Sequence, residues 1–108
     1  MKIKLFTLLA ILLMGFANTA FAQADATQDA LYVKSLAATC ANCHGTKGKA
    51  VDGSSVVSIA GLDRAYIVAQ MKAFKTGERP ATIMHQLSKG YSDAQIETLA
   101  TYFAAQKK

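Results

Sequence analysis

The segment Cys40-Ala41-Asn42-Cys43-His44 constrains the fold of this chain more than any other feature of its sequence. It holds both cysteines and one of the two histidines of the 108-residue chain, in the pattern C-x-x-C-H. Two thiols three positions apart at a helix end can add to two vinyl groups on one edge of a porphyrin. The next residue then places an imidazole at the iron. The pattern predicts one haem c attached through Cys40 and Cys43, with His44 as the proximal iron ligand.

Three other uses of a cysteine pair are less consistent with the sequence. A redox-active thiol pair usually follows a strand in a βαβ unit, whereas this pair follows a helical pattern in a chain without alternating strand patterns. A zinc site needs a fourth ligand, for which only His85 offers another strong nitrogen donor. A structural disulfide needs no histidine directly after its second cysteine. The pattern therefore favours haem attachment.

The N-terminus has the pattern of a secretory signal peptide. Two lysines precede an apolar run over residues 5–16, and Ala20-Phe21-Ala22 forms a cleavage site. The run is shorter than the roughly 20 residues that a membrane span requires. We therefore expect residues 1–22 to be cleaved and the mature protein to reside in the periplasm, without stable membrane insertion.

The remaining residues 23–108 are expected to form a single small domain. Without the two lysines of the signal peptide the net charge falls from +5 to +3. This mild charge includes no basic stripe of the kind that nucleic-acid binding requires. A chain of this size buries little surface by itself, so a cofactor that adds to the core is physically reasonable.

Helical periodicity predicts an all-α domain. We expect helices over residues 25–39, over 63–75 with Asp63 as N-cap and Gly77 as the stop, and from the capping box Ser92-Asp93-Ala94-Gln95 to about Ala105. Residues 82–87 are expected to form a short helical turn. The glycine-rich residues 45–61 are expected to form a long loop, a type of segment that often wraps a ligand.

A second iron ligand must come from Met71, Met84 or His85. Met71 lies on the apolar stripe of the second predicted helix, where core packing is its more common role. Met84 lies in an irregular segment that can present a thioether across the haem. His85 competes with it, and two histidine ligands would give a lower reduction potential than a histidine and a methionine. The pattern favours Met84 over its neighbour.

Several segments together resemble the class I monohaem cytochromes c. The resemblance is closest to the cytochrome subunit of flavocytochrome c sulfide dehydrogenase and to the cytochrome c4 and c553 group. It covers residues 31–103 and rests on the segments C-A-N-C-H-G-T-K-G, Ile59-Ala60-Gly61-Leu62, Gln70 to Gly77, Thr82-Ile83-Met84 and Lys89-Gly90-Tyr91-Ser92-Asp93.

The resemblance implies a cytochrome c fold of three main helices and loops wrapped around one covalently attached haem. In that group the distal ligand is a methionine eight residues before the Ser-Asp that opens the last helix, which here is Met84. The first and last helices are implied to cross, with Leu99, Tyr102 and Phe103 in their contact. Family members often have a Gly-Pro after the haem motif, whose proline carbonyl accepts the imidazole N–H. Gly53-Ser54 stands there in this chain, which leaves the acceptor open.

The implied function is single-electron transfer and not catalysis. The resemblance suggests a flavoprotein sulfide dehydrogenase as electron donor, and a free soluble carrier for a terminal oxidase or reductase is the alternative. A haem enzyme or gas sensor with an open distal site is a third possibility. Arg79 and Tyr91 are weak candidates for contacts with the haem propionates. The residues expected to pack on the haem are Ile59, Leu62, Ile67, Met71, Phe74 and Ile83.

Overall fold

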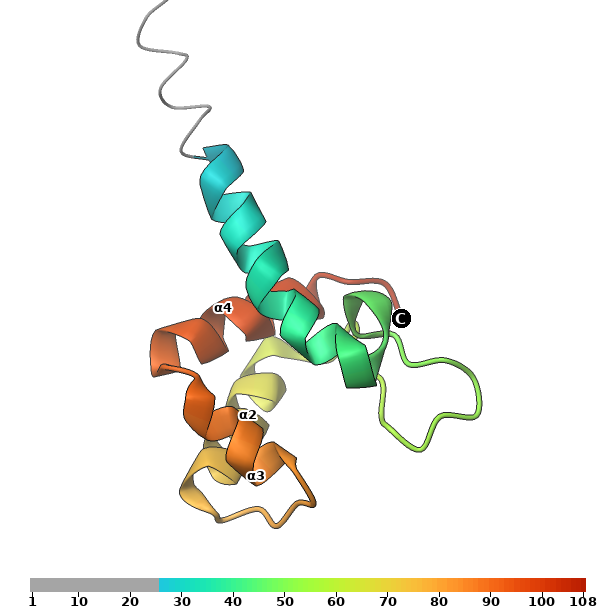
Figure 1. Cartoon of the computed structure of the whole chain (residues 1–108), viewed down its shortest axis with the longest axis vertical. Coiled ribbons are helices and arrows are strands. Elements are labelled where there is room, and N and C mark those ends of the chain that lie inside the picture. Colours follow the sequence, from blue (N-terminus) through green and yellow to red (C-terminus); the bar gives the residue numbers. More distant parts are fainter. Residues whose placement is uncertain (1–25) are drawn as a thin grey trace, which may run out of the picture. The chain divides into compact units, whose positions relative to one another are not determined.

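The computed structural model describes residues 26–108, and regular secondary structure in this range is entirely helical (Figure 1). The predicted signal peptide, residues 1–22, lies outside the described residues. Residues 33–108 form a compact unit. Its elements, in chain order, are the end of a helix over residues 26–44, η1 (Thr46–Gly48), α2 (Arg64–Thr76), α3 (Met84–Leu87), η2 (Ser88–Gly90) and α4 (Asp93–Ala104). The all-α prediction is confirmed. Within residues 26–108, no helix is long and apolar enough to cross a membrane.

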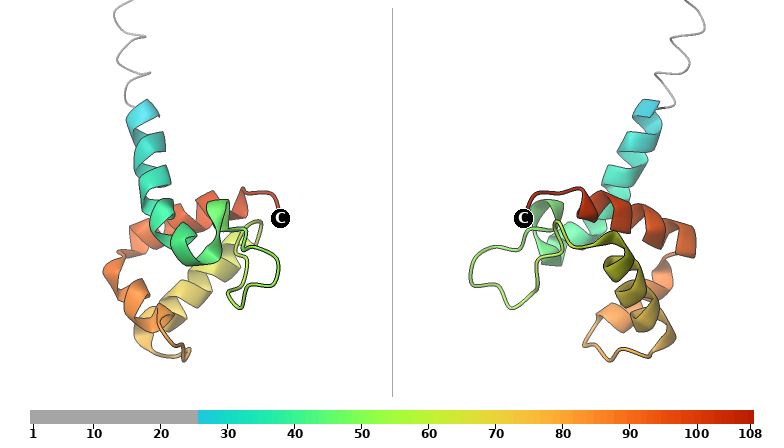
Figure 2. Two further views of the ribbon diagram at one scale, coloured as in Figure 1. Left: turned by 45° about the vertical axis from the view of Figure 1, so that its right-hand side comes forward. Right: turned by 180° about the vertical axis from the view of Figure 1, so that it is seen from behind.

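The first helix continues one turn further than the sequence predicted. Residues 26–44 are helical, so the helix expected over residues 25–39 runs on through the haem motif that follows it without a break (Figure 2). The five residues of the motif contain neither glycine nor proline, and the backbone keeps its helical hydrogen bonds through them. Gly45 then takes a φ of 84°. This left-handed conformation is open to glycine at little cost and ends the helix directly after His44.

α2 lies between the two capping residues that the sequence predicted, Asp63 before it and Gly77 after it. The Asp63 carboxylate accepts a hydrogen bond from the Tyr66 backbone N–H at 2.9 Å, which caps the first turn. Gly77 follows the last turn with a φ of 84°, and its N–H donates to the Phe74 carbonyl at 3.2 Å.

α4 begins at the predicted capping box. Ser92 Oγ accepts from the Gln95 backbone N–H at 3.2 Å, and Gln95 Oε1 accepts from the Ser92 N–H at 2.9 Å. The helix ends at Ala104, one residue from the expected end. Its predicted apolar face is the buried one: Ile96, Leu99, Ala100 and Phe103.

The core lies where α4 meets α2 and the end of the first helix. Ala37, from the first helix, belongs to the same buried cluster as Ile67 of α2 and Leu99, Ala100 and Phe103 of α4. Tyr102 packs against this cluster, and its ring meets that of Phe103 edge to face at 5.1 Å. The implied packing of the first helix against the last is therefore present.

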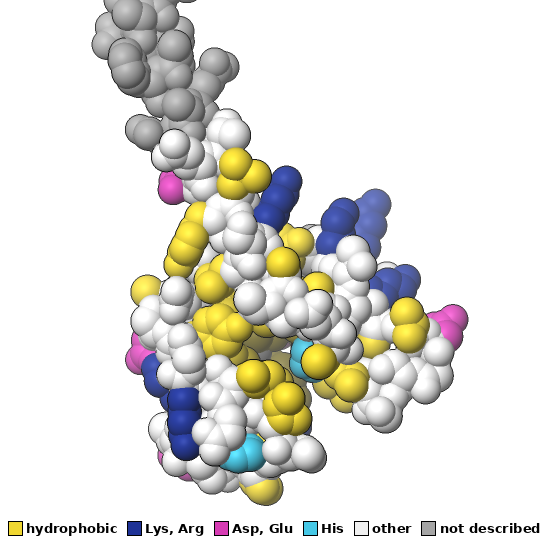
Figure 3. Space-filling model, viewed as in Figure 1, with side chains coloured by type: hydrophobic (Ala, Val, Ile, Leu, Met, Phe, Trp, Pro, Cys, Tyr) yellow, Lys and Arg dark blue, Asp and Glu magenta, His cyan; other side chains and the backbone are white. Residues whose placement is uncertain are grey.

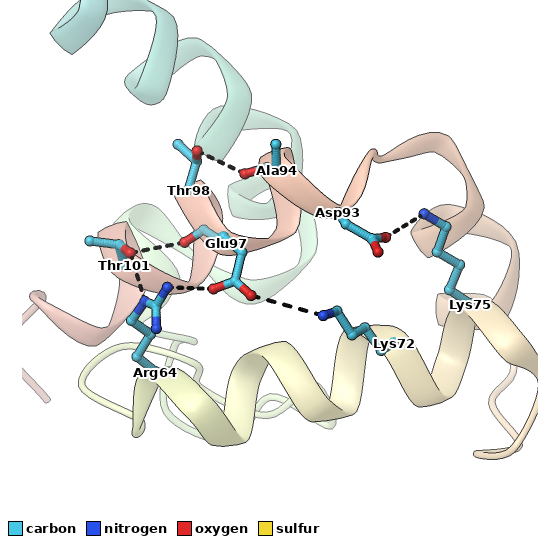
Figure 4. A network of polar contacts seen from close by, with 8 residues as sticks. All are labelled: Arg64, Lys72, Lys75, Asp93, Ala94, Glu97, Thr98 and Thr101. Carbon is cyan, nitrogen blue, oxygen red and sulfur yellow. Dashed lines mark hydrogen bonds and ion pairs between the residues drawn. The ribbon is translucent and has the colours of Figure 1, made fainter.

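A row of polar contacts joins α2 to α4 outside this core (Figure 4). Glu97 of α4 pairs with Arg64 and, at 3.9 Å, with Lys72. Lys75 reaches Asp93 at 3.0 Å, at the start of α4. These side chains are largely exposed, so each pair adds little to stability.

The loop after the first helix is held by the Gly48 carbonyl, which accepts from the N–H groups of Ile59 and Ala60 at 2.7 and 3.0 Å. Gly61 N–H then donates to the Phe103 carbonyl at 2.9 Å. These bonds fix both ends of an exposed excursion over residues 50–58. The segment predicted as a plain loop thus contains the short turn η1 and is anchored to α4.

Candidate functional site

An apolar cavity of about 400 Å³ lies within the unit of residues 33–108. Hydrophobic side chains surround a hollow on the face drawn in Figure 3. The cavity is bordered by Cys40, His44, Val57, Ser58, Ile59, Leu62, Tyr66, Ile67, Gln70, Met71, Phe74, Arg79, Met84, Leu99 and Phe103. A second hollow of about 460 Å³, beside α4, contains none of the predicted site residues.

One face of α2 supplies five of the residues that border the cavity. Tyr66, Ile67, Gln70, Met71 and Phe74 recur at intervals of one, three and four residues and all border the cavity. In an ordinary amphipathic helix this stripe would pack on other side chains. Here it faces a space large enough for a cofactor, since such sites typically enclose roughly 300–1,000 Å³.

The last turn of the first helix brings Cys40 and His44 to the cavity, because residues four positions apart share a helix face. Cys43 does not border the cavity and is exposed. Neither cysteine forms a disulfide. Burial raises the pKa of the Cys40 thiol, and hydrogen bonding to Thr39 and Tyr91 partly offsets that effect.

Thr39 connects this turn to the start of the last helix. Its hydroxyl donates to the Leu36 carbonyl at 2.7 Å, so the Tyr91 hydroxyl, 2.6 Å away, must be the donor of their shared hydrogen bond. Tyr91 does not border the cavity. Its side chain packs against the core cluster, and its hydroxyl holds the end of the first helix through Thr39.

The imidazole of His44 has a fixed orientation. Its Nδ1 lies 2.7 Å from the Val57 carbonyl oxygen. A carbonyl can only accept, so Nδ1 carries a proton and donates it, and in the neutral ring Nε2 keeps its lone pair. Val57 is the acceptor that the sequence left open. No sequence signal could single it out, because every residue has a carbonyl and only the path of the loop decides which one reaches the ring.

Met84 and His85 have different positions although they are neighbours. Met84 is the first residue of α3 and borders the cavity, whereas His85 does not. Nδ1 of His85 is buried without a hydrogen-bond partner within residues 26–108. Met71 borders the cavity from α2 and also packs against the core cluster.

Of the residues expected to pack on a haem, all but Ile83 border the cavity. Ile83, at the N-cap of α3, is 51 % exposed and does not border the cavity, so its predicted contact with the haem has no support in the structure. The chain turns into α3 at this residue, which directs the next side chain, Met84, inward instead. Of the two residues that the sequence offered for contacts with the propionates, Arg79 borders the cavity and Tyr91 does not.

These residues fit a haem of the c type. The cavity is apolar, one wall offers a thiol and an imidazole with a free Nε2, and a thioether comes from a separate element. Among the residues that the structure describes, no cluster of three or more His, Cys, Asp or Glu side chains could hold a metal ion by itself.

No protein-family model matches the chain. It is 38 % identical over 92 residues to the cytochrome subunit of sulfide dehydrogenase from Chlorobaculum tepidum, covering 82 % of this chain and 81 % of that protein. It is 36 % identical over 97 residues to cytochrome c-553 of Helicobacter pylori, covering 88 % and 96 % of the two chains. Cytochrome c4 of Pseudomonas aeruginosa is 34 % identical over 97 residues, and the chain spans 46 % of its length.

A solved structure of cytochrome c4 from Acidithiobacillus ferrooxidans has the same fold. It superimposes with a TM-score of 0.57 and 32 % identity over 61 % of this chain and 37 % of that one. The chain therefore belongs to the class I c-type cytochromes, in the group of cytochrome c4, cytochrome c-553 and the cytochrome subunit of sulfide dehydrogenase, and is an electron-transfer protein and not itself an enzyme.

Proposed function

We propose that this protein carries single electrons in the periplasm through one haem c, attached at Cys40 and Cys43 and ligated by His44 and Met84. The observation that carries the proposal is that Cys40, His44 and Met84 border one apolar cavity, whereas the competing His85 does not. A haem supplies reversible one-electron chemistry at its iron. The periplasmic location rests on the signal-peptide pattern of residues 1–22.

The residues on the proximal side hold the imidazole in place. The Val57 carbonyl keeps the proton on Nδ1 of His44 and sets the plane of the ring, so Nε2 is the atom available to iron. A hydrogen bond of this kind also makes the ligand nitrogen more basic. Cys40 on the buried side and Cys43 on the exposed side would fix one edge of the porphyrin to the same helical turn.

Met84 and the apolar residues of α2 are proposed to set the reduction potential of the haem. With haem bound, the Met84 thioether and the apolar stripe of α2 would give the iron a sulfur ligand and apolar surroundings. Both would favour the less charged ferrous state and so raise the reduction potential. When the chain supplies both axial ligands, no coordination position is left for a substrate. This argues for a carrier over a haem enzyme or a gas sensor.

For the redox partner we propose a flavoprotein sulfide dehydrogenase that delivers electrons to this haem. The similarity to a protein named as the cytochrome subunit of sulfide dehydrogenase supports this choice. The second candidate is a free carrier that serves a terminal oxidase or reductase. It is favoured by the high coverage of cytochrome c-553, 96 % of that protein's length.

The ligand set is tested by three single substitutions in the haem-loaded protein. Met84→Ala should abolish the sulfur-to-iron charge-transfer band of the oxidised protein and let the reduced protein bind carbon monoxide. Met71→Leu and His85→Ala should leave the band in place. If the band survives in Met84→Ala, or is lost in either control, the His44 and Met84 assignment is wrong.

The partner is tested by purification from the native host. A flavoprotein that co-purifies and reduces this haem when sulfide is added would support the subunit role. A protein that elutes alone and takes no electrons from such a flavoprotein would support the free carrier instead.

A further inference from the structure

The wall of the cavity has one polar corner. It is made by Gln70 of α2 and by Arg79, which follows α2 and donates a hydrogen bond to the Gln70 side chain. Apart from His44, Arg79 is the only residue with an ionisable basic side chain that borders the cavity within the described chain. None of the bordering residues is an aspartate or a glutamate. The corner therefore favours an anionic group.

Three contacts hold Arg79 in this corner. Its backbone N–H donates to the Ala73 carbonyl at 3.0 Å, which folds the chain back onto the end of α2. The guanidinium donates to Gln70 Oε1, and its carbon lies 4.7 Å from the centre of the Phe74 ring. Such stacking fixes the plane of the guanidinium. The side chain carries five N–H donors, so one bond to Gln70 leaves a planar edge with donors to spare.

We propose that Arg79, positioned by Gln70 and Phe74, binds a propionate carboxylate of the haem. This rests on the proposed function, because it takes haem as the occupant of the cavity. The apolar walls suit the porphyrin plate but offer nothing to its two carboxylates, and an unpaired carboxylate beside apolar surface is costly. An arginine fork pairs with a carboxylate through two parallel hydrogen bonds. Tyr91, the other candidate from the sequence, does not border the cavity, and its hydroxyl is hydrogen-bonded to Thr39.

The pairing has an electrostatic consequence that a purely structural role would not have. A propionate carries negative charge close to the iron and stabilises the ferric state. Arg79 offsets that charge and so favours the ferrous state. Removing the guanidinium must then lower the reduction potential, by more than removing a cation from elsewhere on the surface.

The experiment measures the reduction potential of the isolated haem-loaded protein for four variants. Arg79→Gln should lower the potential, Arg79→Lys should restore most of the loss, and Gln70→Leu should give a smaller shift of the same sign. Lys89→Gln is the matched control, because Lys89 is exposed, lies outside the cavity and carries the same charge. Its shift should be clearly smaller than that of Arg79→Gln.

Equal shifts in Arg79→Gln and Lys89→Gln would overturn the proposal, and so would a lower unfolding temperature of Arg79→Gln with an unchanged potential. An acidic group of a partner protein could use the same guanidinium. In that case Arg79→Gln would slow electron exchange with the partner but leave the potential of the isolated protein unchanged, which also overturns the proposal.

Failure of the proposed function has a different signature. It would appear as the absence of covalently bound haem in the purified protein, judged by mass and by the pyridine haemochrome spectrum.

Discussion

Gly48 lies close to Phe103 of the core, and its carbonyl holds the loop that follows the haem motif. We therefore expect Gly48→Ala to destabilise the protein strongly. The residue has a φ of 81°, and a Cβ at this position would lie 2.7 Å from Cδ1 of Phe103 and 2.8 Å from Cγ1 of Ile59. Phe103 is 1 % exposed in the middle of the core and cannot move aside. The substitution therefore meets both a strained backbone and a filled space.

The two costs can be separated in magnitude. A non-glycine residue in the left-handed region costs about 1–2 kcal/mol, and overpacking of a close-packed core costs about 1–3 kcal/mol. Gly48→Ala should thus lower the free energy of unfolding by about 2–5 kcal/mol. Gly53→Ala is the control, because Gly53 has nearly the same φ, 80°, but a Cβ there would meet no atom within 4 Å. That variant should lose only about 1–2 kcal/mol.

Equilibrium denaturation of the haem-loaded variants, followed by far-ultraviolet circular dichroism, measures both values. Because a bound cofactor can break two-state unfolding, the same transition is also followed by haem absorbance, and the two transitions should coincide. The Gly48 carbonyl also holds Ile59, two residues after the Val57 carbonyl that orients His44. We therefore expect Gly48→Ala, but not Gly53→Ala, to shift the haem absorption spectrum. If the two variants lose equal stability, the close packing of Gly48 against Phe103 is not an energetic feature of the native protein.

Two further predictions concern the start of α4. Ser92→Ala removes the side-chain acceptor of the capping box and should cost about 1 kcal/mol in denaturant unfolding, whereas Thr98→Ala, in the middle of the same helix, should cost less. The hydrogen bond and charge of Lys75 lower the pKa of Asp93. The ionised carboxylate therefore stabilises the fold above the ordinary aspartate pKa of about 3.9, and this contribution is lost as the pH falls through the lower folded-state value. Asp93→Asn should be less stable than the native protein at neutral pH and equally stable in strong acid, and a difference that persists in acid would contradict this reasoning.

Helix ends marked by local chemistry could be predicted from the sequence. Asp63, Gly77 and the Ser92 capping box act within four residues of chain, so their effect is visible in the sequence itself. The same holds for the α2 stripe and the α4 face, whose spacing identified the residues that line the cavity and fill the core. The end of the first helix has the same kind of signal, because Gly45 follows His44 with a φ of 84°, as Gly77 follows α2.

The features that could not be predicted depend on where a loop returns. Val57 follows His44 by 13 positions in the sequence. The hydrogen bonds from the N–H groups of residues 59 and 60 to the Gly48 carbonyl bring this part of the loop back to the His44 ring. Ile83 was expected to face the haem, but it is exposed because the chain turns at the N-cap of α3. The sequence offered Arg79 and Tyr91 equally for the propionates, and only Arg79 borders the cavity, because its backbone folds back onto Ala73. In each case the path of the backbone between helices decides which group faces inward.

The cavity wall links the folding of this domain to its function. Leu99 and Phe103 belong both to the buried cluster and to the border of the cavity, so the same side chains support the helix packing and face the site proposed for the haem. Residues of the α2 stripe, which an ordinary helix would bury against protein, face the cavity instead. The apolar surface that these side chains remove from water is therefore completed only with the haem attached, and burial of that surface is the main stabilising term for a small domain. Substitutions in this wall should then change stability and reduction potential together, whereas substitutions at the Ser92 cap should change stability alone.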